Sequence, residues 1–176
     1  MLQETDEGNE VRKEGVYMPN FFSPSEIVQM GVEIEKNGRD FYNAVAGLSK
    51  SAGAKKIFEF LAGEEDKHIK VFEDILSTVE KYEPPEAYTE EYFSYLRALS
   101  ESHVFTKKNQ GTEIGSKVKT DKEAINLAIG FEKDSILFYY EMKKLVLADS
   151  HKAIDRLVAQ EQEHLKKLTE LSQNIR

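Results

Sequence analysis

The chain has 176 residues, of which 40% are apolar and 32% are charged, and its formal charge is −8. This length is enough for one domain with a hydrophobic core. The acidic balance argues against nucleic acids and anionic membranes as primary partners. The chain has no cysteine, which excludes disulfides, thiolate metal sites and redox thiols.

No apolar run approaches the ~20 residues that a membrane span requires. The polar, acidic N-terminus has no signal-peptide core. We therefore predict a cytoplasmic protein with a polar arm over residues 1–20 and one domain over residues 21–176.

Four long helices are predicted, because few prolines and glycines interrupt the amphipathic pattern. The first begins at a capping box, Ser23-Pro24-Ser25-Glu26. A second capping box is predicted where Glu123 follows Thr120 at the start of the third helix. The four predicted helices run from residue 23 to about 49, from about 51 to before Pro84, from 120 to about 147, and from 149 to about 174.

A long connection, residues 83–119, separates the second and third predicted helices. Residues 89–101 are rich in aromatic side chains and are predicted to form a short helix. Residues 106–119 are polar and basic and contain glycine, so they are predicted to form an exposed loop, its lysines solvated: Lys107, Lys108, Lys117, Lys119 and, just beyond it, Lys122. A connection of this length is typical of a four-helix bundle with one long crossover.

The chain also contains an internal repeat. The segment with Glu35 and Tyr42 recurs with Glu132 and Tyr139, and Glu65-x-x-His68 recurs as Glu161-x-x-His164. The two halves therefore resemble two copies of one helical hairpin, which predicts an all-α fold.

Each Glu-x-x-His motif places two side chains on one helical face, which suits two ligands of one metal. Alone, either motif could equally be a pair of solvated surface residues. Three observations favour a core site. The motifs and the two partner glutamates lie in the phase of the apolar stripes, whereas Glu33, Glu64 and Glu163 lie off that phase. Each pair of glutamates is also equally far from its hairpin turn, so that each hairpin brings its pair level.

The third observation concerns charge. Four carboxylates buried together would repel one another and would each cost several kcal/mol to desolvate. Two divalent cations would neutralise them. Oxygen ligands with one imidazole per metal suit iron or manganese, and zinc is a further possibility.

One Glu from each of two helices, with Glu-x-x-His from each of the other two, is the ligand pattern of ferritin-like di-metal carboxylate proteins. The spacing from Glu to Tyr, repeated twice, and the Glu64-Glu65-x-x-His68 motif resemble the rubrerythrin branch of that superfamily. The resemblance implies a ferritin-like four-helix bundle that holds two iron ions joined by an oxo or hydroxo bridge. It implies six metal ligands: Glu35, Glu65, His68, Glu132, Glu161 and His164.

In this resemblance, Glu35, Glu65 and His68 serve one metal, the other three residues serve the second, and two of the glutamates bridge. Two departures are visible. The cysteines of a rubredoxin domain are missing, and Ser135 occupies a position where many rubrerythrins have another glutamate.

Two tyrosines and two histidines that are not among the six implied ligands also need an interpretation. Tyr42 and Tyr139 are either ordinary packing residues or donors that orient a ligand carboxylate across the bundle, and their matched placement favours the second interpretation. His103 and His151 are predicted to be ordinary surface or packing residues.

The leading functional hypothesis is an oxidoreductase in which a di-iron site reduces peroxide or reacts with dioxygen, using electrons from an external donor protein. The alternatives are iron oxidation for storage, as in ferritins, and a helical interaction module that binds metal only for structure. The aromatic crossover favours a homodimer over a shell.

Overall fold

The structure is a computed structural model that describes residues 23–79, 90–102 and 104–175. The predicted arm, residues 1–20, lies outside the described residues, as do residues 80–89 of the predicted connection. Within the described part of the chain, the regular structure is entirely helical. This confirms the predicted all-α fold.

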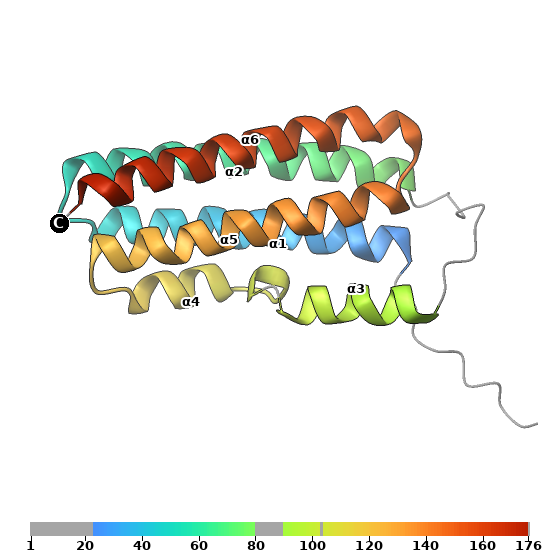
Figure 1. Cartoon of the computed structure of the whole chain (residues 1–176), viewed down its shortest axis with the longest axis horizontal. Helices are drawn as coiled ribbons and strands as arrows, with labels where there is room; N and C mark the ends of the chain where they lie inside the picture. The colour runs from blue at the N-terminus through green and yellow to red at the C-terminus, as the bar shows by residue number, and fades with distance from the viewer. Residues whose placement is uncertain (1–22, 80–89, 103, 176) are drawn as a thin grey trace, which may run out of the picture.

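Four long helices lie side by side along the whole molecule (Figure 1). They are α1 (Pro24–Leu48), α2 (Ala52–Val79), α5 (Asp121–Met142) and α6 (Ala148–Asn174). Short turns join α1 to α2 and, through the 3₁₀ helix η2 (Lys143–Leu145), α5 to α6. These two hairpins pack into a four-helix bundle in which α2 and α5 run in the same direction (Figure 1).

The bundle is held together by its apolar stripes. Each long helix contributes buried side chains to one continuous core, which includes Val28, Phe58, Leu61, Ile125 and Ile154. Burial of a large apolar side chain stabilises a fold by about 1.5–3 kcal/mol. The polar residues on the opposite faces explain how a chain with 32% charged residues still forms a core.

The predicted capping box is complete at the start of α1 and only partly formed at the start of α5. At α1, the Ser23 hydroxyl accepts from the Glu26 N–H and the Glu26 carboxylate accepts from the Ser23 N–H, so the capping box is complete. At α5, Thr120 caps the Glu123 N–H, but the Glu123 carboxylate accepts from the N–H of Lys119 instead. The second predicted box is therefore wrong in its reciprocal half. Helix α5 also ends at Met142 and tightens into η2 before Leu147.

The described part of the crossover contains three helical pieces, where the sequence predicted one. They are α3 (Glu90–Ser102), η1 (Val104–Thr106) and α4 (Gln110–Lys117). The prediction of an exposed loop over residues 106–119 is wrong, because α4 packs on α1. Lys107, Lys108, Lys117, Lys119 and Lys122 are nevertheless exposed, as predicted.

Close contact between backbones explains why α4 can lie on α1. A Cβ atom added at Gly111 would lie 1.9 Å from the carbonyl oxygen of Asn37, and one at Gly115 would lie 2.7 Å from the Ala44 Cβ. The buried Asn37 side chain fixes this contact. Its Nδ2 donates to the carbonyl oxygens of Phe105 and Lys107, both at 2.8 Å, and its Oδ1 accepts from the Gly111 N–H at 2.9 Å. Small residues at this contact and one buried amide therefore hold the crossover against the bundle.

Candidate metal centre

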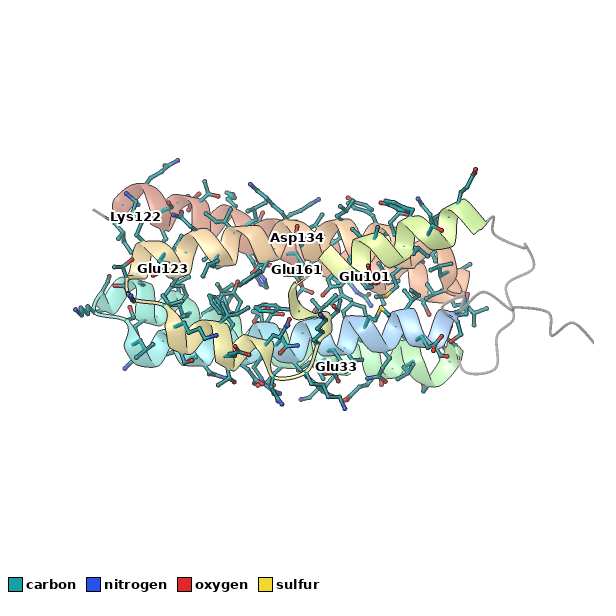
Figure 2. The ribbon with its side chains drawn as sticks, turned by 90° about the horizontal axis from the view of Figure 1, so that it is seen from below. Glu33, Glu101, Lys122, Glu123, Asp134 and Glu161 are labelled. Atoms are coloured by element: carbon teal, nitrogen blue, oxygen red, sulfur yellow. The ribbon has the colours of Figure 1, made fainter. Side chains whose placement is uncertain are left out.

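The polar side chains that the sequence places on the core stripes meet at mid-length of the bundle. Figure 2 shows Glu161 there, level with the middle of the long helices. All six residues are at most 4% exposed, although every one of them is ionisable. They are Glu35 from α1, Glu65 and His68 from α2, Glu132 from α5, and Glu161 and His164 from α6.

The helical period places these groups inward, because each takes the place of an apolar residue on a buried stripe. Gly38 follows Glu35 on the same stripe of α1 and leaves room for a ligand from the next helix. A Cβ atom at this position would meet the Glu65 side chain at 3.5 Å, which is ordinary contact. The α1–α2 hairpin can therefore bring Glu65 close to the α1 backbone.

The six residues form two overlapping sets of candidate ligands. In each set, one ligand atom from each residue lies within 4.8 Å of the others. The first set comprises Glu35, Glu65, His68 and Glu161, and the second comprises Glu65, Glu132, Glu161 and His164. Glu65 and Glu161 belong to both sets, which is the arrangement expected for two adjacent cations that share two carboxylates.

Several buried polar atoms of this cluster lack a hydrogen bond. Both ring nitrogens of His68 and the Oε1 atom of Glu161 are buried and have no hydrogen-bond partner among the described residues. His68 Nδ1 does lie 2.9 Å from that Oε1 atom and 3.4 Å from carboxylate oxygens of Glu35 and Glu65, although without hydrogen-bond geometry. A cation would satisfy such converging acceptors. The residues present therefore fit a two-metal site, while the role of each as a ligand stays a prediction.

Comparison with known proteins agrees with this geometry. The rubrerythrin family profile matches residues 26–172, which include nearly all of the four bundle helices and all six candidate ligands. The chain belongs to the rubrerythrin family. A crystal structure from Thermotoga maritima, provisionally assigned as a ferritin-like diiron-carboxylate protein, is similar with a TM-score of 0.65 and 29% sequence identity. The match covers 89% of this chain and 98% of that one.

No curated protein matches the chain. The described helices include none with the length and apolar character of a membrane span. The fold of this rubrerythrin-family domain is ferritin-like, and a buried Glu/His cluster that fits a metal site lies in its core.

In the metal-free protein, the charge of the cluster depends on which of its buried side chains are protonated. Burial, reinforced by the neighbouring carboxylates, raises the pKa of Glu65 well above its usual value and that of Glu132 to about 8. Burial disfavours the charged form of His164, but Glu132 and Glu161 outweigh it and raise the histidine pKa to about 9. Burial would likewise raise the pKa of Glu161, yet the hydrogen bond with His164 and the nearby charge of His68 hold this pKa well below its usual value. Without cations, the cluster at neutral pH is an array of protonated and ion-paired groups.

These pKa shifts predict that the metal-free protein loses stability as pH rises. The folded-state pKa values of Glu132, about 8, and His164, about 9, exceed their ordinary values of 4.5 and 6.5. The folded protein therefore binds more protons than the unfolded chain, and that contribution is lost as pH rises through about 8 to 9. Thermal unfolding at pH 6, 7.5 and 9 should show a falling melting temperature.

Bound metal should oppose this loss, because a metal displaces the protons and binds only the native state. Its stabilising effect is about 2.7 kcal/mol at a hundredfold excess over Kd. The melting temperatures with and without metal should therefore diverge as pH rises. A difference that is zero or that shrinks with pH would contradict a metal site built from these groups.

Two buried tyrosines donate hydrogen bonds to the outer carboxylates of the cluster, Glu35 and Glu132, which belong to one ligand set each. The Tyr42 hydroxyl donates to Glu132 Oε1, and the Tyr139 hydroxyl donates to Glu35 Oε1, each from the facing hairpin. Burial and the nearby carboxylates raise the pKa of both phenols well above the usual value, so both remain neutral donors. This geometry is what the second interpretation of the tyrosines requires, and its catalytic consequence stays a prediction.

The remaining predicted features lie apart from the cluster. Ser135 is buried on the core side of α5, where many rubrerythrins carry a further glutamate. His151 is half-buried, and its Nε2 lies 3.3 Å from the carbonyl oxygen of Val146, outside both ligand sets. His103 lies outside the described residues. Sequence reasoning missed Asn37, although its position on a core-facing phase of α1 was a visible signal.

Proposed function

We propose that this rubrerythrin-family protein is a di-iron oxidoreductase that reduces peroxide with electrons from a separate donor. The observation that carries the proposal is the pair of buried ligand sets that share Glu65 and Glu161. When bound, two adjacent irons would supply the two electrons that cleave the O–O bond of hydrogen peroxide, and two protons would complete the conversion of the peroxide to two water molecules. Dioxygen is the alternative oxidant of the same site.

The position of each residue in the cluster indicates its role. Glu65 and Glu161 would hold both metals, Glu35 with His68 would hold one, and Glu132 with His164 would hold the other. Hydrogen bonds from Tyr139 and Tyr42 would keep the two outer carboxylates oriented while the charge of the site changes. Carboxylate oxygens with one imidazole for each metal support iron, with manganese or zinc as alternatives.

The electron source is expected to lie outside the 176 residues. They contain no cysteine and therefore no iron–thiolate centre. We propose an external donor protein, and we retain the homodimer and the cytoplasmic location from the sequence prediction. Light scattering of the purified protein tests the dimer directly.

The proposed function is tested by single turnover. Iron-loaded protein is reduced anaerobically, freed of reductant and titrated with hydrogen peroxide. We expect one peroxide to be consumed for each pair of irons, after which the reaction stops and the near-ultraviolet absorption of a diferric site is complete. Added reductant should restart it.

Three outcomes would contradict the proposal. Sustained peroxide loss without reductant would indicate disproportionation. Retention of many irons per chain after exposure to Fe²⁺ and dioxygen would favour storage. Bound metal that shows no redox change would favour a structural site in an interaction module.

A further inference from the structure

Buried aromatic side chains flank the candidate metal centre along the bundle and on the side that faces the crossover. Phe58 stacks on Tyr42 and Phe72 lies against Tyr139, with ring centroids 6.3 Å and 4.9 Å apart, and both phenylalanines are fully buried. Because they lie before and after Glu65 and His68 along α2, they close the centre in both directions along the bundle.

The crossover closes the face formed by α1 and α5. Phe105 from η1 contacts Phe131 of α5 at 4.1 Å between ring centroids and Phe41 of α1 at 6.0 Å. All three rings are buried. Asn37 and the Gly111 contact hold the crossover against this side of the bundle.

The opposite face, between α2 and α6, is covered differently. Phe60 of α2 lies edge-on to the candidate ligand His164, with ring centroids 6.3 Å apart and planes at 88°. Yet Phe60 is 45% exposed. Several aromatic side chains lie against the candidate ligands, but among the described residues Phe60 is the one that is also exposed to solvent. Lys167 places its Nζ 5.6 Å from the Phe60 ring centroid.

From this juxtaposition we infer that Phe60 is the gate through which metal ions and small oxidants reach the di-metal centre, with Lys167 holding its ring against His164. The inference rests on the proposed function and deepens it, because an opening made by the rotation of one side chain is narrow and admits hydrogen peroxide more readily than bulky organic hydroperoxides. In this inference, rotation of Phe60 away from His164 opens the path, whereas Phe58, Phe72 and Phe105 are buried and packed against other rings. Phe60 is a positioning and access residue and holds no metal itself.

The test measures entry of a metal into metal-free protein, independently of turnover. Co²⁺ is mixed with wild type, Phe60→Ala, Phe60→Trp and Leu137→Ala, and its visible absorption is followed to completion. Leu137 is the matched control, since it is 46% exposed on α5. We expect Phe60→Ala to take up Co²⁺ about tenfold faster than wild type, Phe60→Trp to be slower, and Leu137→Ala to match wild type. Final metal content should be the same in all four.

A second readout uses the reduced iron form. The ratio of oxidation rates with hydrogen peroxide and tert-butyl hydroperoxide should fall in Phe60→Ala and should stay at the wild-type value in Leu137→Ala. Phe60→Trp keeps the inference testable should Phe60→Ala fail to fold. Equal uptake rates in all variants, with full final loading, would overturn the gate and leave the proposed function intact. Failure of the wild type itself to bind Co²⁺ would overturn both.

Discussion

Replacing Glu65 or Glu161 with alanine is expected to remove both metal ions, whereas replacing Glu35 or Glu132 removes one. The reason is geometric, because the first two carboxylates belong to both ligand sets and the other two belong to one set each. Successive residues of a helix lie about 100° apart around its axis. A neighbouring carboxylate could therefore replace a lost ligand only if the helix rotated. Iron per chain, measured after identical reconstitution of each variant, checks this expectation. His68→Ala and His164→Ala should weaken binding and retain some metal, because the carboxylates remain.

Exposed glutamates on the same helices provide the controls. Glu163 follows Glu161 on α6 with a side chain 61% exposed, and Glu59 precedes Glu65 on α2 at 57%. Alanine at either position should keep both metals and change the free energy of unfolding by less than about 0.5 kcal/mol. If these controls lost iron while Glu65→Ala and Glu161→Ala retained it, the assignment of core-facing residues would be wrong. Equal losses from all four core variants would contradict the sharing of Glu65 and Glu161.

The second large effect is expected at Gly111. Alanine there would place a methyl group 1.9 Å from the Asn37 carbonyl oxygen, so α4 would have to move away from α1. Backbone atoms of two packed helices cannot yield as a flexible side chain can. Overpacking of a tight contact costs about 1–3 kcal/mol, and the displaced helix also loses the hydrogen bond from the Gly111 N–H to Asn37 Oδ1, which contributes about 1 kcal/mol. Denaturant unfolding should therefore show a loss of about 2–4 kcal/mol.

Gly63 offers a matched control for this substitution. It lies in the middle of α2, is exposed, and has open space where a Cβ atom would be placed. Gly63→Ala should raise the free energy of unfolding by about 0.5–1 kcal/mol, because alanine favours a helix over glycine. A Gly111→Ala protein as stable as the wild type would mean that α4 does not pack on α1 in solution.

The positions of the candidate ligands could be predicted because helical geometry is strict. A glutamate in the phase of an apolar stripe can point only into the core, and equal distances from a hairpin turn bring two such residues level. The sequence could not show which carboxylates are shared, since that depends on the relative height of the two hairpins. The structure shows this relative height, because Glu65 and Glu161 from different hairpins lie close enough to belong to both ligand sets.

The crossover was mispredicted because its stability is not local. Residues 110–117 contain two glycines and polar side chains, which by propensity favour a loop. Here those glycines allow a close approach that a larger residue would prevent, and packing outweighs propensity. Glu33 and Glu64 were also predicted to lie off the core phase, with Glu64 nearer its edge. Their side chains are only 16% and 13% exposed, so both are poorer surface controls than Glu163.

The placement of Glu161 on α6 has a consequence for biosynthesis. Both candidate ligand sets include this carboxylate, and among the described helices α6 is the last to leave the ribosome. A nascent chain that ends before residue 161 can complete neither set. The order of the candidate ligands along the chain therefore predicts that metal binding waits until translation has supplied α6.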